Sequence, residues 1–420
     1  MEKIIVRGGR KLQGEVDISI AKNSVLPIIV ATILNPTEII LKKVPMLEDV
    51  TVLINLLREL NCEVQFSSIT GDLKINTLNL KEVDPNSELI RKMRASFLVM
   101  GPMLARFGRC KISMPGGCNI GSRPVDLHLK GFKSLGIESE IGYGYVEAKV
   151  DKLHGNRIYL DFPSVGATEN IMMAAILAPG ITVIENAAEE PEIWDLARFL
   201  NSMGAKIEGA GYGKITIHGV SQLKQPEPFT PIFDRIEAGT FMVAAGITNS
   251  KITINGVNEE HLMPTIEKLK GCGVYCSIDG QKMIVDGTQE KKPVDIKTMP
   301  YPGFPTDMQA QIMALLSITR GVSVITETVF ENRFMHVGEL GRMGANIKID
   351  GRIAIVEGVS TLTGCEVKAT DLRAGAAMIL AGLVANGETE IGEVYHIDRG
   401  YTNIEEKFKK LGAEIYRIHK

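Results

Sequence analysis

The chain has 420 residues, of which 45% are hydrophobic, and a formal net charge of −3. This length predicts two domains with sizeable cores, and the near-neutral charge excludes a bulk basic field for nucleic acid. The longest apolar runs, at 25–34 and 376–385, are too short to span a bilayer. The six cysteines show no paired spacing and no signal peptide precedes them, so we expect a cytoplasmic protein with reduced thiols.

The chain begins with two strand-like segments within residues 3–19, ahead of the first helix. We expect this piece to complete a sheet in the C-terminal domain. The chain would then cross between domains near Ile20 and again in the proline-rich segment 226–231. This predicts one domain at 22–229 and a discontinuous second domain at 1–21 plus 230–420, with a hinge and an active site in the cleft between them.

One unit repeats six times at a spacing of about 70 residues, longer than solenoid repeats. Each copy contains an apolar helix, a strand, an amphipathic helix and a hairpin. A hydrophobe-Gly-hydrophobe or hydrophobe-Asn-hydrophobe break follows the amphipathic helix, because Gly and Asn tolerate the left-handed conformation after a helix C-terminus. The breaks are centred on Asn61, Gly136, Gly204, Gly273, Gly344 and Gly412.

The first helix of each copy is apolar on nearly every face, which is typical of a buried helix. The second helix is amphipathic and should lie outside it. The sequence therefore predicts an α/β protein of two inside-out domains, each of three repeats with buried helices and outer sheets.

The fourth copy is the clearest. A helix at 234–247 carries Asp234 and Glu237 in capping-box spacing. Asp279-Gly280 then marks a hairpin between two strands. A second capping box is expected at Thr306 and Gln309, which would leave the neighbouring Asp307 unnecessary as a cap. On that basis, Asp307→Asn would leave the melting temperature within a few degrees of the wild-type value.

Common cofactor motifs are missing from the sequence. There is no GxxxxGK[ST] or HExxH, and the glycine-rich run 209–213 lies between two strands, as a hairpin turn does. We therefore expect no organic cofactor and no metal.

The stretch 114–128 combines a thiol, a guanidinium and several glycines. Cys118 lies in a Gly-rich loop and Arg123 follows five residues later. A nearby cation lowers the pKa of a thiol, so Cys118 is a candidate reactive group. The alternative is a buried cysteine that acts as a small hydrophobe. Residues from Asp126 onward then open an apolar-periodic helix.

Polar residues open the first helix of each copy, and free helix N-termini attract anions. Five arginines fall beside turns or helix ends. Any one of them alone is most simply an exposed arginine, but their recurrence predicts a ligand with several phosphates or carboxylates. They are Arg94 on a predicted helix at 88–104, Arg123, Arg333, Arg373 and Arg399.

These stretches resemble the UDP-N-acetylglucosamine 1-carboxyvinyltransferase family of enolpyruvyl transferases, essentially from end to end. The motifs are Lys22-Asn23, Arg94, the run from Pro115 to Asp126, Ser164-Val165-Gly166-Ala167-Thr168, Pro305-Thr306-Asp307, Glu331-Asn332-Arg333-Phe334, Ala369-Thr370-Asp371-Leu372-Arg373 and Asp398-Arg399-Gly400.

The resemblance implies transfer of the enolpyruvyl group of phosphoenolpyruvate to the 3′-hydroxyl of UDP-N-acetylglucosamine, with release of phosphate. This is the first committed step of peptidoglycan biosynthesis. The resemblance also implies the inside-out fold, no metal or cofactor, and no nucleic-acid or membrane partner. The alternatives are a 3-phosphoshikimate 1-carboxyvinyltransferase, which lacks the thiol loop, and a non-enzymatic scaffold that binds an anion.

Roles follow from the resemblance position by position. Cys118 is implied to be the loop thiol that protonates the substrate or helps to release the adduct, and to be the attachment site of fosfomycin. Asp307 is implied to be the base near the sugar hydroxyl. The phosphate ligands are implied to be Lys22, Arg123 and Arg399, and the carboxylate ligands Arg333 and Arg373. The remaining implied substrate-binding residues are Asn23, Arg94, Pro124, Val125, Asp126, Leu127, Ser164, Val165, Gly166, Val329 and Asp371. One departure is Phe162-Pro163, where some members have a lysine before the serine motif.

Overall fold

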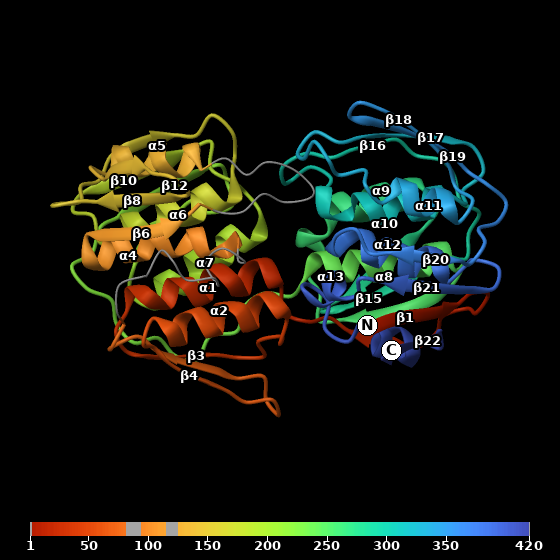
Figure 1. The fold of residues 1–420 in the computed structure, drawn as a ribbon, viewed down its shortest axis with the longest axis horizontal. Coiled ribbons are helices and arrows are strands. Elements are labelled where there is room, and N and C mark those ends of the chain that lie inside the picture. The colour runs from red at the N-terminus through yellow and green to blue at the C-terminus, as the bar shows by residue number, and fades with distance from the viewer. Residues whose placement is uncertain (1, 81–93, 115–124, 420) are drawn as a thin grey trace. The chain divides into compact units, whose positions relative to one another are not determined.

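The computed structural model describes residues 2–80, 94–114 and 125–419, apart from the side chains of residues 94–96. They form two units, each with its own hydrophobic core. The N-terminal unit comprises 20–80, 94–114 and 125–232, and the C-terminal unit comprises 2–19 and 233–419 (Figure 1). No helix within these described ranges is long and apolar enough to cross a membrane.

The N-terminal unit alternates helices with short strands. Its elements are α1 (Lys22–Ala31), η1 (Thr32–Leu34), β3 (Glu38–Leu41), α2 (Glu48–Glu59), β4 (Glu63–Phe66), β5 (Leu73–Asn76), η2 (Arg94–Val99), α4 (Met100–Phe107), β6 (Arg109–Ser113), α5 (Asp126–Ser134), β7 (Glu138–Ile141), β8 (Tyr145–Lys149), β9 (Arg157–Tyr159), α6 (Val165–Ala175), β10 (Ile181–Glu185), α7 (Pro191–Ser202), β11 (Lys206–Glu208) and β12 (Lys214–His218).

The C-terminal unit follows the same pattern. Its elements are β1 (Glu2–Arg7), β2 (Glu15–Asp17), α8 (Arg235–Ile247), β13 (Lys251–Asn255), η3 (Glu259–His261), α9 (Met263–Gly271), β14 (Tyr275–Asp279), β15 (Lys282–Asp286), β16 (Ile296–Lys297), η4 (Thr306–Met308), α10 (Gln309–Leu316), β17 (Val322–Thr326), α11 (Val337–Arg342), β18 (Asn346–Asp350), β19 (Ile353–Glu357), β20 (Glu366–Lys368), α12 (Leu372–Gly382), β21 (Glu388–Gly392), α13 (Tyr395–Asp398), α14 (Ile404–Lys410) and β22 (Glu414–His419).

The described strands form three small sheets in each unit. In the C-terminal unit, α8, α10 and α12 pack against one another, and every residue of α8 and α10 is buried. The same holds for nine of the eleven residues of α6 in the N-terminal unit. Helices without a polar face are thus enclosed and the sheets lie outside them (Figure 1). The predicted inside-out α/β fold is confirmed.

The N-terminal segment completes two sheets rather than the single sheet expected from the sequence. In most copies the strand after the buried helix pairs with the second strand of the hairpin, as β13 pairs with β15. In the last copy β1 takes that position, between β21 and β22. β2 instead pairs in parallel with β13 at the edge of another sheet. The last copy therefore lacks a hairpin strand of its own, which corrects the expectation that it was complete.

Local signals were accurate at the repeat breaks and at the start of α8. All six residues at the repeat breaks have positive φ, from 67° at Asn61 to 96° at Gly344, as a left-handed residue after a helix requires. Asp234 accepts hydrogen bonds from the backbone nitrogens of Ile236 and Glu237 and caps α8. The predicted helix at 88–104 differs, because its described part is η2 followed by α4 and extends to Phe107.

Candidate active site

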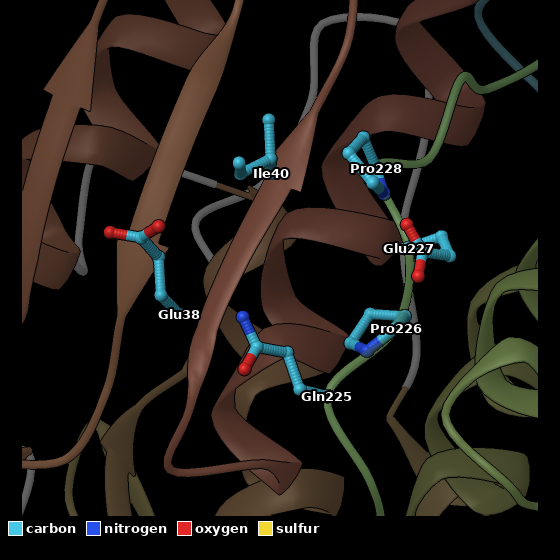
Figure 2. A pocket seen from close by; sticks show the side chains of 6 residues that line it. All are labelled: Glu38, Ile40, Gln225, Pro226, Glu227 and Pro228. Atoms are coloured by element: carbon cyan, nitrogen blue, oxygen red, sulfur yellow. The ribbon is translucent and has the colours of Figure 1, made fainter.

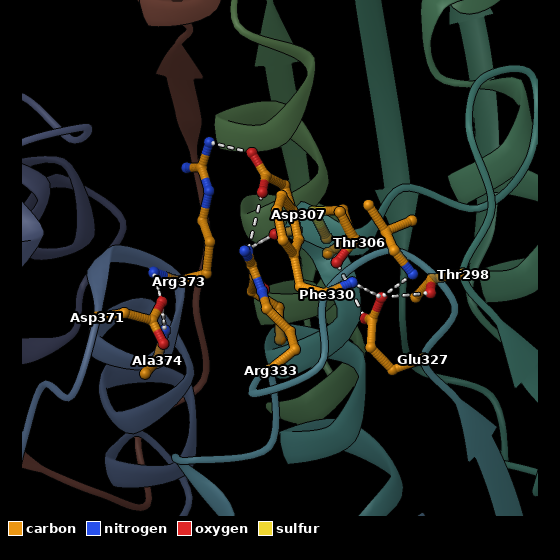
Figure 3. Close-up of polar contacts among 12 residues, drawn as sticks. Thr298, Thr306, Asp307, Glu327, Phe330, Arg333, Asp371, Arg373 and Ala374 are labelled. Atoms are coloured by element: carbon orange, nitrogen blue, oxygen red, sulfur yellow. Dashed lines mark hydrogen bonds and ion pairs between the residues drawn. The ribbon is translucent and has the colours of Figure 1, made fainter. Parts of the chain in front are cut away.

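Asp307 lies in η4, immediately before the buried helix α10, and is held by two arginines. Its Oδ1 accepts a hydrogen bond from Arg333 Nη2 at 2.8 Å, and its Oδ2 accepts one from Arg373 Nη2 at 3.0 Å (Figure 3). Only 3% of each arginine side chain is exposed. Three residues that are far apart in the sequence therefore form one buried charged group.

Secondary structure positions both arginines. Arg373 is the second residue of α12, whose N-cap Asp371 accepts hydrogen bonds from Arg373 N at 2.8 Å and Ala374 N at 3.1 Å. Arg333 lies in the turn between β17 and α11. Asp371, a predicted cleft residue, thus acts here as the helix cap that fixes the backbone of Arg373.

The arginines control the ionisation of Asp307. Burial by itself would raise the pKa of this carboxyl, but Arg373 and Arg333 outweigh it and hold the pKa well below its usual range. The same pairing raises the pKa of Arg373 against the opposing effect of burial. Asp307 is therefore a permanently ionised carboxylate in this arrangement.

Arg373 has hydrogen-bond donors without an acceptor among the described residues. Its Nε and Nη1 are buried and make no hydrogen bond to any described residue, while its Nη2 contacts Asp307. A buried guanidinium N–H without an acceptor is costly, so each of these two groups is suited to an acceptor oxygen of an anionic ligand.

A buried polar cluster lies beside this group. Tyr401 is 1% exposed, and its hydroxyl lies 2.9 Å from Thr240 Oγ1 and 3.3 Å from Gln311 Nε2. Gln311 Nε2 also donates to the backbone oxygen of Asp307 at 2.8 Å, and the Arg373 guanidinium lies 5.4 Å from the centroid of the Tyr401 ring. This cluster supports Asp307 through its backbone and Arg373 through a cation–π contact.

Glu327, which the sequence interpretation missed, organises the neighbouring loops. Its Oε1 accepts hydrogen bonds from Thr298 Oγ1 and Val329 N, both at 2.8 Å, and from Phe330 N at 3.1 Å. Its Oε2 accepts one from Thr306 Oγ1 at 2.9 Å. Figure 3 shows this carboxylate beside Thr298, Thr306 and Phe330.

The expected capping box at Thr306 is wrong. The hydroxyl of Thr306 donates to Glu327, the N-cap of η4 is Pro305, and no side chain caps the turn. The side-chain nitrogen and oxygen of Gln309 are buried without a hydrogen-bond partner among the described residues. The Thr306 hydroxyl, which a capping box would have used for a backbone N–H, instead bonds to the carboxylate of Glu327, a residue distant in the sequence.

In the N-terminal unit, Lys22 is the first residue of α1 and is 8% exposed. Its Nζ lies 2.6 Å from a carboxylate oxygen of Asp49, in the first turn of α2. Asn23, which follows it, is exposed. The ion pair fixes the lysine ammonium at the start of a buried helix. Asp49 was not among the residues predicted from the sequence.

The structure brings together two stretches whose residues were implied to bind substrate. Gly166 lies in the first turn of α6 beside the ring of His128, in the first turn of α5. Asn170 Nδ2 lies 3.0 Å from His128 Nδ1 and also donates to the backbone oxygen of Phe97 at 3.0 Å. Burial lowers the pKa of His128 to about 4, so the ring is neutral at pH 7. The hydroxyl of Ser164 caps α6 at Ala167 N.

Other predicted residues have simpler positions. Val125 is buried, Asp126 is exposed, and Leu127 and Val165 are half-buried. Val329 donates its backbone N–H to Glu327. Arg399 is half-buried at the end of α13, directly after Asp398, which Arg417 holds in a two-pronged ion pair at 2.8 and 2.6 Å.

Comparisons with known proteins agree on the family. The family model described as EPSP synthase (3-phosphoshikimate 1-carboxyvinyltransferase) matches residues 6–408. The chain is 65% identical over 418 residues to UDP-N-acetylglucosamine 1-carboxyvinyltransferase 2 of Clostridium tetani, and 63% identical over 418 residues to UDP-N-acetylglucosamine 1-carboxyvinyltransferase 1 of Clostridium acetobutylicum, with 100% of both chains covered each time. The chain belongs to the UDP-N-acetylglucosamine 1-carboxyvinyltransferase group of the EPSP synthase family.

A more distant enolpyruvyl transferase shares the fold of this family. The solved structure of NikO from Streptomyces tendae matches with a TM-score of 0.88 at 23% identity, covering 99% of this chain and 98% of that one. At this identity the match concerns the fold alone.

Part of the predicted transferase site falls outside the described residues. This part contains Cys118, Arg123, Pro124 and the side chain of Arg94. Their roles stay predictions. Among the described residues, no three His, Cys, Asp or Glu side chains cluster as metal ligands would.

One pocket of the N-terminal unit holds none of the predicted transferase residues. It lies between β3 and the segment 225–228, and its lining is Glu38, Ile40, Gln225, Pro226, Glu227 and Pro228 (Figure 2). Two carboxylates and two prolines offer no cation to a phosphorylated substrate, so we assign this pocket no part in enolpyruvyl transfer.

Proposed function

We propose that the chain transfers the enolpyruvyl group of phosphoenolpyruvate to the 3′-hydroxyl of UDP-N-acetylglucosamine and releases phosphate, the first committed step of peptidoglycan biosynthesis. The observation that carries the proposal is 65% identity over the full length to a relative of that name. The chemistry of the described residues supports it in the following steps.

The carboxylate of phosphoenolpyruvate is proposed to bind Arg373 and Arg333. The Nε and Nη1 groups of Arg373 are buried donors without a described acceptor, and Arg333 lies on the other side of Asp307. Two guanidiniums around one carboxylate give strong, directional recognition. The shared contact with Asp307 keeps both arginines in place before the substrate binds.

Asp307 is proposed to remove the proton of the 3′-hydroxyl. Paired with two arginines, it is ionised but only weakly basic. When the substrate carboxylate joins the same arginines, it shares their positive charge, and the pKa of Asp307 rises toward the range that a general base needs. Binding of phosphoenolpyruvate would thus activate the base that serves the acceptor.

The reaction is proposed to proceed by addition and elimination. Cys118 donates a proton to C3 of phosphoenolpyruvate while the 3′-oxygen, losing its proton to Asp307, forms a bond to C2. The Cys118 thiolate then takes a proton back from C3, the double bond re-forms, and the bond from C2 to the phosphate oxygen breaks, with its electron pair leaving on phosphate, which takes up the proton held by Asp307. Lys22, Arg123 and Arg399 are proposed to bind that phosphate, and Asp49 holds Lys22 for this role.

The nucleotide is proposed to contact the first turns of α5 and α6. Contacts among His128, Asn170 and Gly166 hold these two turns against each other. No lysine precedes Ser164, but Lys130 Nζ lies 2.6 Å from Asp161, three residues before Ser164. Lys130 is therefore a cation paired with the residue directly before Phe162-Pro163, where the chain departs from the family pattern.

The proposal is tested by measuring phosphate release from phosphoenolpyruvate with three acceptor conditions: UDP-N-acetylglucosamine, shikimate 3-phosphate, and no acceptor. We expect release only with the sugar nucleotide. Release only with shikimate 3-phosphate would favour the activity named in the family model. No release with either acceptor would favour a non-enzymatic binding protein.

A further inference from the structure

Glu327 is an unusual residue for a buried position. It is 1% exposed, it follows β17 directly, and it forms no ion pair with any described residue. Four donors nevertheless surround its carboxylate, two of them hydroxyls and two of them backbone N–H groups. A buried carboxyl group without such donors would be strongly destabilising, so this environment is built around Glu327.

Each of these contacts reaches a different part of the candidate site. Thr306 precedes Asp307 in η4, and Oε2 of Glu327 accepts its hydroxyl hydrogen bond. Val329 N and Phe330 N begin the turn that ends in Arg333, and both donate to Oε1. The positions of Asp307 and Arg333 therefore depend on the two oxygens of one carboxylate.

The loop after β16 also forms a hydrogen bond to the Glu327 carboxylate. Thr298 Oγ1 donates to Glu327 Oε1 at 2.8 Å and accepts from Thr328 N at 3.0 Å. Thr328 Oγ1 donates in return to Thr298 O at 2.6 Å. The loop after β16 and the loop after β17 thus form a closed hydrogen-bonded frame in which Glu327 cannot change rotamer without breaking several bonds.

We infer that Glu327 is a positioning residue for enolpyruvyl transfer, which sets the separation of Asp307 and Arg333. The inference rests on the proposed function. It does not require Glu327 to touch either substrate. Its effect arises because Asp307 must meet a hydroxyl while Arg333 meets a carboxylate, and a displacement of about 1 Å between such groups can cost roughly a hundredfold in rate.

Side-chain chemistry gives a graded series of variants. In Glu327→Gln the amide oxygen can still accept the three donors at Oε1, but the amide nitrogen then faces Thr306, whose hydroxyl must accept instead of donate. Thr306→Val removes the same contact from the other side, and Thr306→Ser keeps it. Glu327→Ala removes all four contacts.

Thr319→Val is the matched control for Thr306→Val. Thr319 follows α10, as Thr306 precedes it, and is 2% exposed, with its hydroxyl donating to Leu315 O at 2.9 Å. The substitution removes one buried hydroxyl from the opposite end of the same helix. It should cost at least as much stability as Thr306→Val and leave turnover unchanged.

For the activity readout, kcat and KM for phosphoenolpyruvate are measured for each variant. We expect kcat to fall about tenfold in Glu327→Gln and in Thr306→Val, and about a hundredfold in Glu327→Ala. Thr306→Ser should restore wild-type kcat. The double variant Glu327→Gln/Thr306→Val should be no slower than the slower single variant, because both changes remove one contact.

A second readout needs no substrate. Hydrogen exchange in α10 and α12 gives the equilibrium constant for opening of the C-terminal unit. A double-mutant cycle of Asp307→Asn and Arg333→Met then gives the factor by which the two substitutions depart from independent effects on this constant, which is their coupling. In the wild-type background we expect a coupling of roughly tenfold or more, as for residues in contact. With Glu327→Ala the coupling should fall by at least about threefold. If Glu327→Ala does not fold, Thr306→Val is used in the same cycle.

The two readouts separate the inference from the proposed function. If wild-type protein releases no phosphate but the coupling falls when Glu327 is replaced, the proposed function is wrong and the positioning of Asp307 and Arg333 by Glu327 stands. If the coupling is unchanged, or if Glu327→Gln and Thr306→Val retain wild-type kcat in an active enzyme, Glu327 is not a positioning residue.

Discussion

Replacing Asp307 with asparagine should destabilise the C-terminal unit as well as stop turnover. The change keeps the shape of the side chain but removes the negative charge between two arginines that are each 3% exposed. The amide oxygen can accept from one guanidinium, while the amide nitrogen must face the other. Neither buried guanidinium then has a counter-charge at position 307.

The size of the effect follows from the burial of the arginines. Breaking a buried ion pair by removing one partner costs about 3–5 kcal/mol. Since Asp307 itself is 24% exposed, we expect the lower end, about 3 kcal/mol at pH 7. A domain of this size loses about 2–4 °C per kcal/mol, so the melting temperature should fall by about 6–12 °C. Loss of an acid–base group should lower kcat by about 10²-fold or more.

The pH dependence of stability provides an independent check. The folded pKa of Asp307 lies below its unfolded value of about 3.9. Its contribution is therefore fully present above the unfolded pKa and is lost as the pH falls below it toward the folded pKa. The stability difference between wild type and Asp307→Asn should be largest near neutral pH and should narrow below about pH 4, as urea or thermal unfolding at several pH values would show.

Asp286→Asn is the matched control. Asp286 ends β15 and accepts hydrogen bonds only from Thr288 among the contacts described, so its replacement should change the unfolding free energy by no more than about 0.5 kcal/mol. The reasoning is refuted if Asp307→Asn is as stable as Asp286→Asn at pH 7, or if it turns over at the wild-type rate.

Three further predictions concern the phosphate and the thiol. Cys118 should alkylate faster than the other cysteines in limited labelling followed by peptide mass mapping, since burial raises the pKa of a competitor such as Cys276 to about 12; preferential labelling of Cys276 would contradict it. Arg399→Ala should raise KM for phosphoenolpyruvate by about two orders of magnitude and leave sugar-nucleotide affinity unchanged in calorimetry. An equal loss of affinity for both ligands would show that Arg399 does not bind the phosphate. Asp49→Asn should cost about 3 kcal/mol in urea unfolding and slow turnover by releasing Lys22, whereas unchanged stability would mean that the ion pair is not needed.

The sequence predicted what local chemistry decides. A left-handed residue after a helix needs only its own backbone freedom, so Gly344 and its counterparts revealed the repeats and hence the fold. The cap of α8 at Asp234 depends on residues two and three positions away and was predicted correctly. The reciprocal half of the capping box was not, because Asp234 N donates to Ser19 O and Glu237 accepts from Ser19 N.

Contacts between distant segments were beyond the sequence. Thr306 had a suitable local partner at Gln309, but its hydroxyl binds Glu327, 21 residues away. Nothing in the sequence distinguishes Glu327 from a solvated carboxylate at the end of a strand. The small stability effect first expected for Asp307→Asn gives way to a larger expected loss, because Arg333 of the same repeat copy and Arg373 of the last copy converge on that carboxylate.

The most direct test of enolpyruvyl transfer is NMR analysis of the product formed from phosphoenolpyruvate and UDP-N-acetylglucosamine, with phosphate measured in the same sample. We predict one vinyl ether on the 3′-oxygen of the sugar for each phosphate released, and no product from a 3′-deoxy acceptor. Phosphate release without a modified sugar nucleotide, or an enolpyruvyl group on any other oxygen, would contradict the account.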